Sequence, residues 1–549
     1  MKFRDDMAQD HFRDMREQLQ LQREQGLTDE QLQDAYRRAL GNIQLHLQSC
    51  QSGLDQFPSL PQQYTVPADQ LSSLESMEIL ERHAYPQDLQ HTESVRLSAL
   101  LNQDQRSAYD HIMHAVNGSR DNGNLFFVNG PGGTGKSLLF KSILAQVRSQ
   151  DQIALPVASS GIAAILLPGG RTAHSRFKIP VSNEPTLSCR VSLGTPTAHL
   201  IKSAALILWD EAVMSSRFNF EAVDRLLKDI MGADDPALEH VLFGGKVVVF
   251  GGDFRQILPV VPKGTPSQII ADCIISSYIW QGVKVLTLVE NMRVRGTNQE
   301  AVDFAKMLLA VGNGDPPYQE HVQIPRHWLL DSEDVSTLIN KIYPSLSLAS
   351  DPSFFATRAI LTTKNQFVDR INNHATQAFP GAEMVYRSND CVIDGDDPDA
   401  DSMNYPVEFL NRCNPSGLPS HTLAIKVGMP LIILRNIDVE NGLCNVKAYI
   451  GGNEFLIPRI NFTSNEDELP FSLRPAFAMT IHKSQGQTLN HVGVYLNESA
   501  FTHGQLYVAL SRATDPASLS IAVPLSNSSP TSSSTSPTAK NVVYRSVLK

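Results

Sequence analysis

The chain has little of what marks a secreted or membrane-bound protein. Its six cysteines are scattered along 549 residues without a C-x-x-C pair, which argues against a disulfide framework or a zinc site and favours free thiols. No apolar run reaches the ~18 residues that a membrane span needs. The amino-terminal stretch carries acidic residues and no apolar core, so we expect neither a signal peptide nor a transit peptide.

The sequence also has no excess of positive charge. Lys and Arg number 46 against 57 Asp and Glu, which gives a formal net charge of −11 and argues against a general nucleic-acid coat protein. A local basic groove remains compatible with this charge, because phosphate contacts act within ~10 Å. The length predicts three or four domains at about 150 residues each.

A glycine-rich turn between a strand and a helix organises the chain. Residues 130–137 fit G-x-x-x-x-G-K-[ST], after the apolar run Leu125–Val128 and before the helical start at Leu138. Glycines let backbone N–H groups close around phosphates, and the helix adds its positive dipole end. Lys136 can reach the β- and γ-phosphates of a nucleotide and Ser137 can hold Mg²⁺. The expected nucleotide ligands here are Gly130, Gly132, Gly133, Thr134, Gly135, Lys136 and Ser137.

Two later strands end in polar residues that suit nucleotide hydrolysis. The apolar run 205–209 ends at Asp210 and Glu211, where one carboxylate can hold Mg²⁺ and the other can activate water. An isolated Asp-Glu pair could instead cap the next helix. The strand 246–250 leads to Gln256, which we expect at the same edge of a parallel sheet, near the γ-phosphate.

Gln105 opens a helix about two dozen residues before the glycine-rich turn. Its amide carries both a donor and an acceptor, so it can read the edge of adenine. The alternative is an ordinary surface glutamine.

The loop 169–178 mixes hydroxyl, basic and aromatic side chains. Thr172 and His174 offer polar contacts to phosphates, and Phe177 offers a face for a base, as single-strand binding requires. The alternative is a solvated basic loop with Phe177 in the core.

The remaining pattern predicts an α/β protein with several parts. The tail is rich in Ser, Thr and Pro, so we expect it to be disordered. The expected segments are a helical extension and linker (1–95), a first parallel-sheet domain (96–290), a second domain in two parts (291–404 and 475–524), a small β insertion (405–474) and the tail (525–549).

In their order, these motifs resemble superfamily-one DNA helicases, most closely the petite-integration-frequency (PIF) family and its Helitron-transposon relatives. The resemblance runs from about residue 101 to residue 523. It is most specific at Gly130–Ser137, Ser159–Ala164 with Arg171–Ser175, Asp210–Glu211, Gly251–Gln256, Thr480–Thr488 and Tyr507–Arg512.

The resemblance implies a P-loop NTPase with two RecA-like domains, ATP and Mg²⁺ between them, and DNA across both. It implies Gln105 on adenine, Ser137 and Asp210 on the metal, Glu211 as catalytic base and Gln256 as γ-phosphate sensor. Arg293 and Arg512 would act as arginine fingers, and Gln485 and Gly486 would meet the nucleotide. The implied DNA contacts are Ser159, Ser160, Gly161, Thr172, His174, Phe177, His482 and Lys483.

The β insertion departs from the family pattern. Leu443–Asn445 is followed by Val446–Ala448 instead of Gly-Thr-Arg, and Phe471–Arg474 runs directly into Pro475 without a basic linker. The implied small β-barrel is therefore shortened. This leaves open a single-strand-dependent ATPase or translocase that does not unwind, and a non-catalytic DNA-binding scaffold from a decayed copy. A nucleotide kinase would leave the second α/β unit without a role.

The resemblance implies 5′-to-3′ movement on single-stranded and forked DNA. It also implies work in repair, recombination, telomere maintenance or transposon replication, and a nuclear location, although no clear import signal is present. Neither a membrane nor zinc is expected as a partner.

Overall fold

The computed structural model describes residues 77–118, 124–181, 184–294, 299–330, 332, 334–344, 346, 352–388, 409, 421–433, 447–448, 473–523 and 537–548. The chain divides into two compact units, Met1–Glu81 and Arg82–Lys549, and nearly all described residues belong to the second. Among the described residues, no helix combines the length and the apolar character needed to cross a lipid bilayer. The predicted helical extension before residue 77 lies outside them.

A six-stranded parallel sheet forms the first half of the second unit, with the order β3-β2-β4-β5-β1-β6. Strands β2 and β5 are buried at every position, because helices cover both faces of a parallel sheet. The strands are β1 (Leu125–Asn129), β2 (Ile153–Ala158), β3 (Arg171–Thr172), β4 (Ala204–Asp210), β5 (Val247–Gly252) and β6 (Val283–Thr287).

Helices surround this sheet, and their starts follow local capping chemistry. Asn102 caps α6, and Ser216 caps α11 by accepting the N–H of Phe218. The longer helices of this half are α4 (Met77–His83), α5 (Gln87–Ser98), α6 (Gln103–Val116), α7 (Lys136–Ser149), α10 (Pro196–Ser203), α11 (Arg217–Gly232) and α12 (Pro266–Asp272); the short ones are α8 (Gly161–Ile165) and α9 (Ala173–Phe177).

The predicted linker up to residue 95 is wrong in its last part. Residues 87–98 form α5, which packs along α7. Ser94 Oγ donates to Gln146 Oε1 at 2.5 Å, and Gln87 Nε2 donates to the Ser149 carbonyl at 2.8 Å. The first domain therefore begins before residue 96, because polar contacts hold a helix whose composition resembles a linker.

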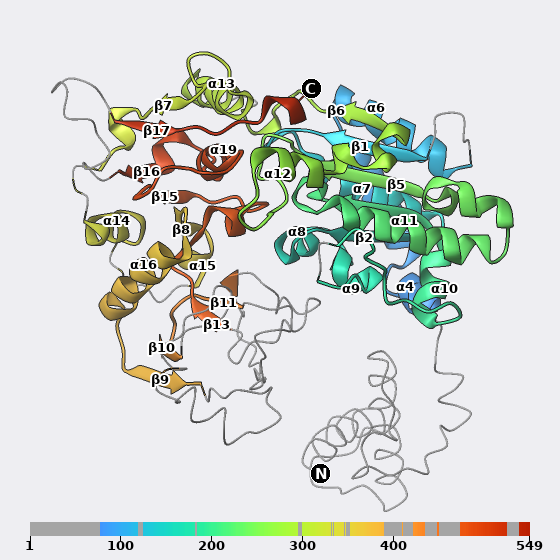
Figure 1. Cartoon of the computed structure of the whole chain (residues 1–549), viewed down its shortest axis with the longest axis horizontal. Helices are drawn as coiled ribbons and strands as arrows, with labels where there is room; N and C mark the ends of the chain where they lie inside the picture. The colour runs from blue at the N-terminus through green and yellow to red at the C-terminus, as the bar shows by residue number, and fades with distance from the viewer. Residues whose placement is uncertain are drawn as a thin grey trace, which may run out of the picture. The chain divides into compact units, whose positions relative to one another are not determined.

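A four-stranded parallel sheet, β14-β8-β15-β16, forms the second half. Alternate residues of its strands face two separate cores: α13 and α19 cover one face and α14 and α16 cover the other (Figure 1). The strands are β8 (Arg358–Thr362), β14 (Ala478–Thr480), β15 (His491–Tyr495) and β16 (Leu519–Ala522). The helices are α13 (Gln299–Asn313), α14 (Val335–Ile342), α15 (Pro352–Ala356), α16 (Asn365–Ala378) and α19 (Gln505–Ser511).

Small antiparallel sheets lie along the chain between β8 and β14. β9 (Glu383–Arg387) pairs with β10 (Thr422–Lys426), and β11 (Leu431–Ile433) pairs with β12 (Lys447–Ala448) and β13 (Leu473–Pro475). β10, β11 and β12 lie within the stretch 405–474 that was predicted as a β insertion, whereas β9 lies before it. Most of the predicted insertion at 405–474 lies outside the described residues.

The predicted disorder of the tail is wrong for residues 537–548. Strand β17 (Thr538–Lys540) pairs antiparallel with β7 (His321–Gln323), and Figure 1 shows the two side by side although they come from distant parts of the chain. Ala539 and Val547 are buried. The Ser/Thr/Pro composition misled the prediction, because the short apolar run after it finds a strand edge and a core to join.

Candidate functional site

The predicted phosphate loop lies between β1 and α7, and its backbone requires glycine. Gly133 and Gly135 have φ of +97° and +77°, in the left-handed region that glycine adopts without strain. A Cβ on Gly135 would lie 2.3 Å from Gln105 Nε2, and one on Gly130 would lie 2.5 Å from Thr134 Oγ1. Larger residues at these two positions would therefore displace the loop.

Gln105 anchors the phosphate loop to the start of α6 by hydrogen bonds. Its side chain is fully buried, its Oε1 accepts the Asn102 N–H at 2.9 Å and its Nε2 donates to the Thr134 carbonyl at 2.9 Å. The amide thus ties the start of α6 to the loop. An additional contact to adenine stays a prediction.

The chemical groups predicted for hydrolysis meet at the loop. Lys136 begins α7, and its ammonium donates to the Gly130 carbonyl. Ser137 is exposed in the first turn of the same helix. Asp210 ends β4, and its Oδ1 accepts the N–H of Glu211 at 2.8 Å. Both acids are nearly inaccessible, so their carboxylates point into the protein near Lys136.

Burial dominates the electrostatics of the two acids. It raises the pKa of Asp210, and the Lys136 charge only partly opposes this effect. Burial and then the charge of Asp210 raise the pKa of Glu211, while Lys136 and Arg512 lower it. Glu211 also has φ of +50°, a conformation that costs a non-glycine residue about 1–3 kcal/mol. Glu211 therefore combines a strained backbone with a carboxylate that is repelled by Asp210.

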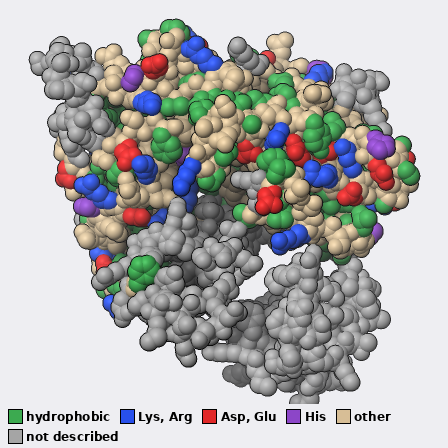
Figure 2. Space-filling model, viewed as in Figure 1, with side chains coloured by type: hydrophobic (Ala, Val, Ile, Leu, Met, Phe, Trp, Pro, Cys, Tyr) green, Lys and Arg blue, Asp and Glu red, His purple; other side chains and the backbone are tan. Residues whose placement is uncertain are grey.

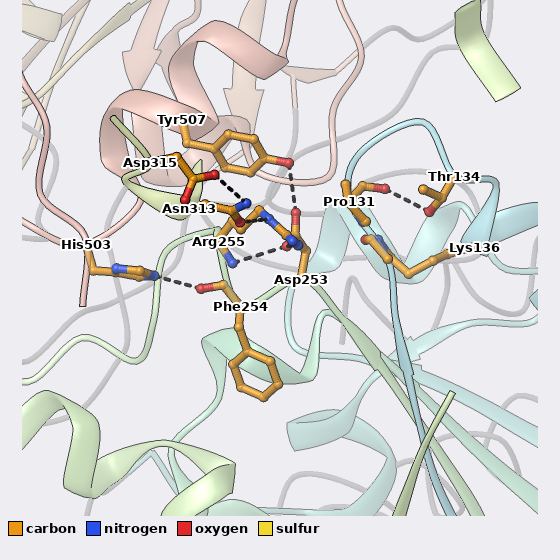
Figure 3. A network of polar contacts seen from close by, with 11 residues as sticks. Pro131, Thr134, Lys136, Asp253, Phe254, Arg255, Asn313, Asp315, His503 and Tyr507 are labelled. Carbon is orange, nitrogen blue, oxygen red and sulfur yellow. Dashed lines mark hydrogen bonds and ion pairs between the residues drawn. The ribbon is translucent and has the colours of Figure 1, made fainter. Parts of the chain in front are cut away.

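The loop after β5 carries Gln256 to the same edge of the sheet. Asp253 is fully buried, and its Oδ1 accepts from Arg255 Nη1 at 3.2 Å (Figure 3). Arg255 Nε donates to Asn313 Oδ1 at 2.7 Å, so this loop is tied to the end of α13. We call residues 253–256 the sensor loop.

The second sheet presents its own groups to this site. Arg512 is 5% exposed and donates to the Gln487 carbonyl at 2.8 Å, and its charge acts on Glu211. Gly486 has φ of +81°, and a Cβ there would lie 4.0 Å from Glu211 Oε1. Gln485 precedes it and is 2% exposed. The structure therefore brings these predicted residues from the second half against the acids of the first.

Several buried polar atoms at this junction have no hydrogen-bond partner among the described residues. They are Glu211 Oε2, Gln256 Oε1 and both amide atoms of Gln485. Buried polar groups are normally paired, so these atoms fit a site for a polar ligand. Ser137 and Asp210 supply the oxygen atoms that Mg²⁺ prefers, and the loop N–H groups suit phosphates. The residues present thus fit a magnesium nucleotide.

Arg293 is the predicted site residue about which the structure says least. Its backbone belongs to the short 3-10 helix Met292–Val294, and the N–H of Met292 donates to the Gly133 carbonyl at 2.9 Å. The side chain of Arg293 lies outside the described residues. Its role as an arginine finger stays a prediction.

The predicted DNA contacts of the first sheet lie at the ends of neighbouring strands. Ser159 Oγ accepts the Trp209 Nε1–H at 3.0 Å, Ser160 caps α8, which begins at Gly161, and Thr172 caps α9, which contains His174. The hydroxyl groups of Ser160 and Thr172 therefore already bond the local backbone, and that of Ser159 bonds a neighbouring side chain. On the face in Figure 2, basic and acidic side chains are intermixed and form no single basic patch. DNA binding by these residues stays a prediction.

Phe177 does not offer its ring to a base. It is fully buried, and its ring stacks on Trp209 with the centroids 6.1 Å apart. The alternative of a core phenylalanine is therefore correct, because the ring fills the space beside β4. His482 and Lys483 follow β14 in a short 3-10 helix and are partly exposed, which keeps them accessible to a ligand.

Two residues in contact with the sensor loop were missed. Tyr507 Oη donates to Asp253 Oδ2 at 2.9 Å, and His503 contacts the Phe254 carbonyl at 2.7 Å (Figure 3). Both lie in the stretch 501–513, where the resemblance implied a role for Arg512 alone. No local signal in this helix identifies the partner of Tyr507.

Comparisons with known proteins place this site in context. A family model described as PIF1-like helicase matches residues 100–321, one described as DNA helicase Pif1, 2B domain, matches residues 408–447, and one described as a helicase matches residues 459–543. The second match falls within the predicted β insertion.

Individual relatives agree with these matches. ATP-dependent DNA helicase PIF1 of Danio rerio is 28% identical over 418 residues, which cover 71% of this chain and 57% of that protein. ATP-dependent DNA helicase Pif1 of Campylobacter jejuni is 25% identical over 72% of this chain and 88% of that protein. A crystal structure of Bacteroides Pif1 bound to ssDNA shares the fold, with a TM-score of 0.51, 22% identity and coverage of 77% of this chain and 92% of that one. The chain thus spans little more than half the length of the zebrafish relative.

Proposed function

We propose that the chain is a PIF1-like DNA helicase that couples ATP hydrolysis to movement along single-stranded DNA, because a family model and relatives of that description match it. One observation carries the proposal: Lys136, Asp210 and Glu211 of the first sheet meet Gly486 and Arg512 of the second. When a nucleotide binds between two sheets, its hydrolysis can change the position of one sheet relative to the other.

The residues divide the chemistry among them. The loop N–H groups and Lys136 bind the phosphates, and Ser137 and Asp210 hold Mg²⁺, which as a Lewis acid would neutralise phosphate charge. Glu211 accepts the proton of the attacking water. Its raised pKa suits a base that works near neutral pH.

The second sheet supplies the groups that make hydrolysis depend on closure. On the first half, the unpartnered Gln256 Oε1 can accept a hydrogen bond from the water. On the second half, Arg512 offers positive charge to the γ-phosphate, and the unpartnered amide of Gln485 offers hydrogen bonds to the phosphate or the water. Each interaction draws the two sheets together while ATP is bound. Hydrolysis removes the bridging phosphate, so closing and opening can become steps along DNA.

The DNA partner follows from the relatives. The Bacteroides protein in the matching structure is bound to single-stranded DNA, and another matching structure concerns unwinding of forked duplex DNA by Pif1 helicases. We extend these partners, 5′-to-3′ movement and a nuclear location to this chain. Repair, recombination, telomere maintenance and replication of a Helitron-like transposon are the processes we consider.

ATP hydrolysis with and without single-stranded DNA tests the proposal. We expect DNA to stimulate turnover strongly in the native protein, and Lys136→Ala to abolish it while DNA binding persists. Turnover that is indifferent to DNA would overturn the helicase assignment. An absence of hydrolysis in folded native protein would favour the non-catalytic scaffold.

Strand displacement on forked duplexes separates a helicase from a translocase. The shortened β insertion favours the translocase as the second candidate, because the family pattern is incomplete there. Forks with a 5′ or a 3′ single-stranded arm also determine polarity. Displacement from the 5′ arm supports the helicase, and DNA-stimulated hydrolysis without displacement supports the translocase.

A further inference from the structure

The segment 537–548 is firmly held on the second half of the protein. Beyond the pairing of β17 with β7, Asn541 Nδ2 donates to the carbonyls of Val311 and Tyr318 at 2.8 and 2.7 Å. The guanidinium of Arg545 donates to the Gly314 carbonyl. The segment is therefore anchored to the end of α13 and to the turn that follows it.

From this anchored segment the backbone reaches His503. The Tyr544 N–H donates to His503 Nδ1 at 2.8 Å, and the Gly504 N–H donates to the Val542 carbonyl at 3.0 Å. The rings of Tyr544 and His503 stack with centroids 5.2 Å apart. Because Nδ1 accepts a backbone N–H, the imidazole is neutral and carries its proton on Nε2.

The Nε2–H of His503 donates to the Phe254 carbonyl at 2.7 Å, inside the sensor loop. The side chain of His503 is fully buried, so no water competes for this bond. The neighbouring backbone is equally close: a Cβ on Gly504 would lie 2.3 Å from the Arg255 carbonyl oxygen. A continuous path of contacts thus runs from Tyr544 through His503 to the sensor loop.

We propose that His503 is a positioning residue for the sensor loop, and that the segment 537–548 fixes the tautomer with which it acts. This inference rests on the proposed ATPase function. Nothing in the geometry brings His503 to the nucleotide itself. It acts through the Phe254 carbonyl, which lies two residues before Gln256, and so controls where the Gln256 amide points.

Two substitutions separate the two hydrogen bonds of His503. His503→Gln places an amide N–H where Nε2 lies, so it can still donate to Phe254. His503→Asn places a carbonyl oxygen near the position of Nδ1, so it can still accept from Tyr544 but cannot reach Phe254. Both variants replace a buried imidazole by an amide, and each therefore controls for the other.

We expect DNA-stimulated kcat to fall about tenfold in His503→Asn, with a smaller change in KM for ATP, because hydrogen bonds of this kind contribute that order of stabilisation. His503→Gln should keep kcat within about threefold of the native value by the same reasoning. Melting temperatures of both variants show whether they are equally folded.

Two results would overturn the inference: native kcat in His503→Asn, or equal losses in both variants that track a lower melting temperature. The DNA stimulation of native turnover distinguishes a failure of the proposed function from a failure of the role of His503. If native turnover is not stimulated by DNA, the proposed function itself fails. If native turnover is stimulated and His503→Asn matches it, only the role of His503 fails.

Discussion

The Tyr507 hydroxyl donates a 2.9 Å hydrogen bond to the Asp253 carboxylate, across 254 positions of sequence. Tyr507 lies on α19 against the second sheet, and Asp253 begins the sensor loop at the end of β5. The tyrosine is 2% exposed, and its burial and the charge of Asp253 raise the pKa of its hydroxyl well above the ordinary value. A hydrogen bond with the Gly132 backbone weakly opposes this, so the same oxygen also lies at the phosphate loop. One phenol thus joins both loops of the nucleotide site to the opposite sheet.

Tyr507→Phe tests this link with little change in volume. A hydrogen bond to a buried charged group contributes about 1.5–3 kcal/mol, so we expect DNA-stimulated kcat to fall by about ten- to a hundredfold. The affinity for single-stranded DNA should change little, because Tyr507 lies inside the nucleotide site. Steady-state kinetics with a DNA-binding titration check this. Unchanged kcat would show that packing alone joins the two halves.

Glu211→Gln should separate catalysis from stability. We expect turnover to fall by at least about a hundredfold, because general-base catalysis contributes that much. Without nucleotide, the variant should unfold at a temperature no lower than the native protein at pH 8. The raised pKa of Glu211 means that its ionised form destabilises the fold, and the amide removes that charge.

The comparison of native protein and Glu211→Gln at several pH values gives the control. Because the pKa of Glu211 rises from 4.5 to about 7 on folding, the destabilisation grows as the pH rises from 4.5 to about 7 and is constant above that value. The stability advantage of the variant should therefore grow with pH. A variant that is less stable than the native protein at every pH would contradict this account.

Phe177→Ala should damage folding more than DNA binding. Removing a fully buried phenylalanine costs about 3–5 kcal/mol, because the cavity beside Trp209 cannot collapse completely. Phe177→Leu keeps most of the volume and serves as the control. Urea unfolding measures the loss of stability in both variants. DNA binding, detected by fluorescence at a temperature where both variants are folded, measures any direct role in binding. A large loss of DNA affinity in folded Phe177→Leu would restore a direct role.

We predict that His482 lowers the free energy of unfolding at acid pH. Burial lowers the pKa of His482 from 6.5 to about 4. The unfolded chain therefore takes up a proton more readily, and stability falls as the pH drops from 6.5 towards 4, by at most about 3 kcal/mol. His482→Gln should flatten urea-unfolding free energies over this range. An unchanged slope in the variant would show that other groups set the acid limit.

The phosphate loop and the two acids could be predicted from sequence because their spacing is local. The pattern at 130–137 and the acids after an apolar strand each lie within one element and its turn. Their meeting follows from the parallel sheet, since β1 and β4 end at the same edge. Local pattern and the general rule for parallel sheets were sufficient here.

The contacts of Tyr507, His503 and Phe177 could not be predicted in this way. Each depends on how separate elements come together: Tyr507 on the meeting of two sheets, His503 on a segment whose composition suggested disorder, and Phe177 on the side of a short helix that faces Trp209. The β-branched and aromatic residues Val542, Val543 and Tyr544 were a signal for ordered structure, but the Ser/Thr/Pro run before them obscured that signal.

The order of the strands along the chain has a consequence for synthesis on the ribosome. All six strands of the first sheet are complete by Thr287, whereas the second sheet joins β8 to β14 and β15, and β15 to β16, which are translated much later, up to Ala522. Because domains fold as units during translation, the phosphate loop can form on a nascent chain that still lacks Gln485 and Arg512. Such a chain would bind nucleotide before it could hydrolyse it. Incomplete nascent chains would therefore not consume ATP.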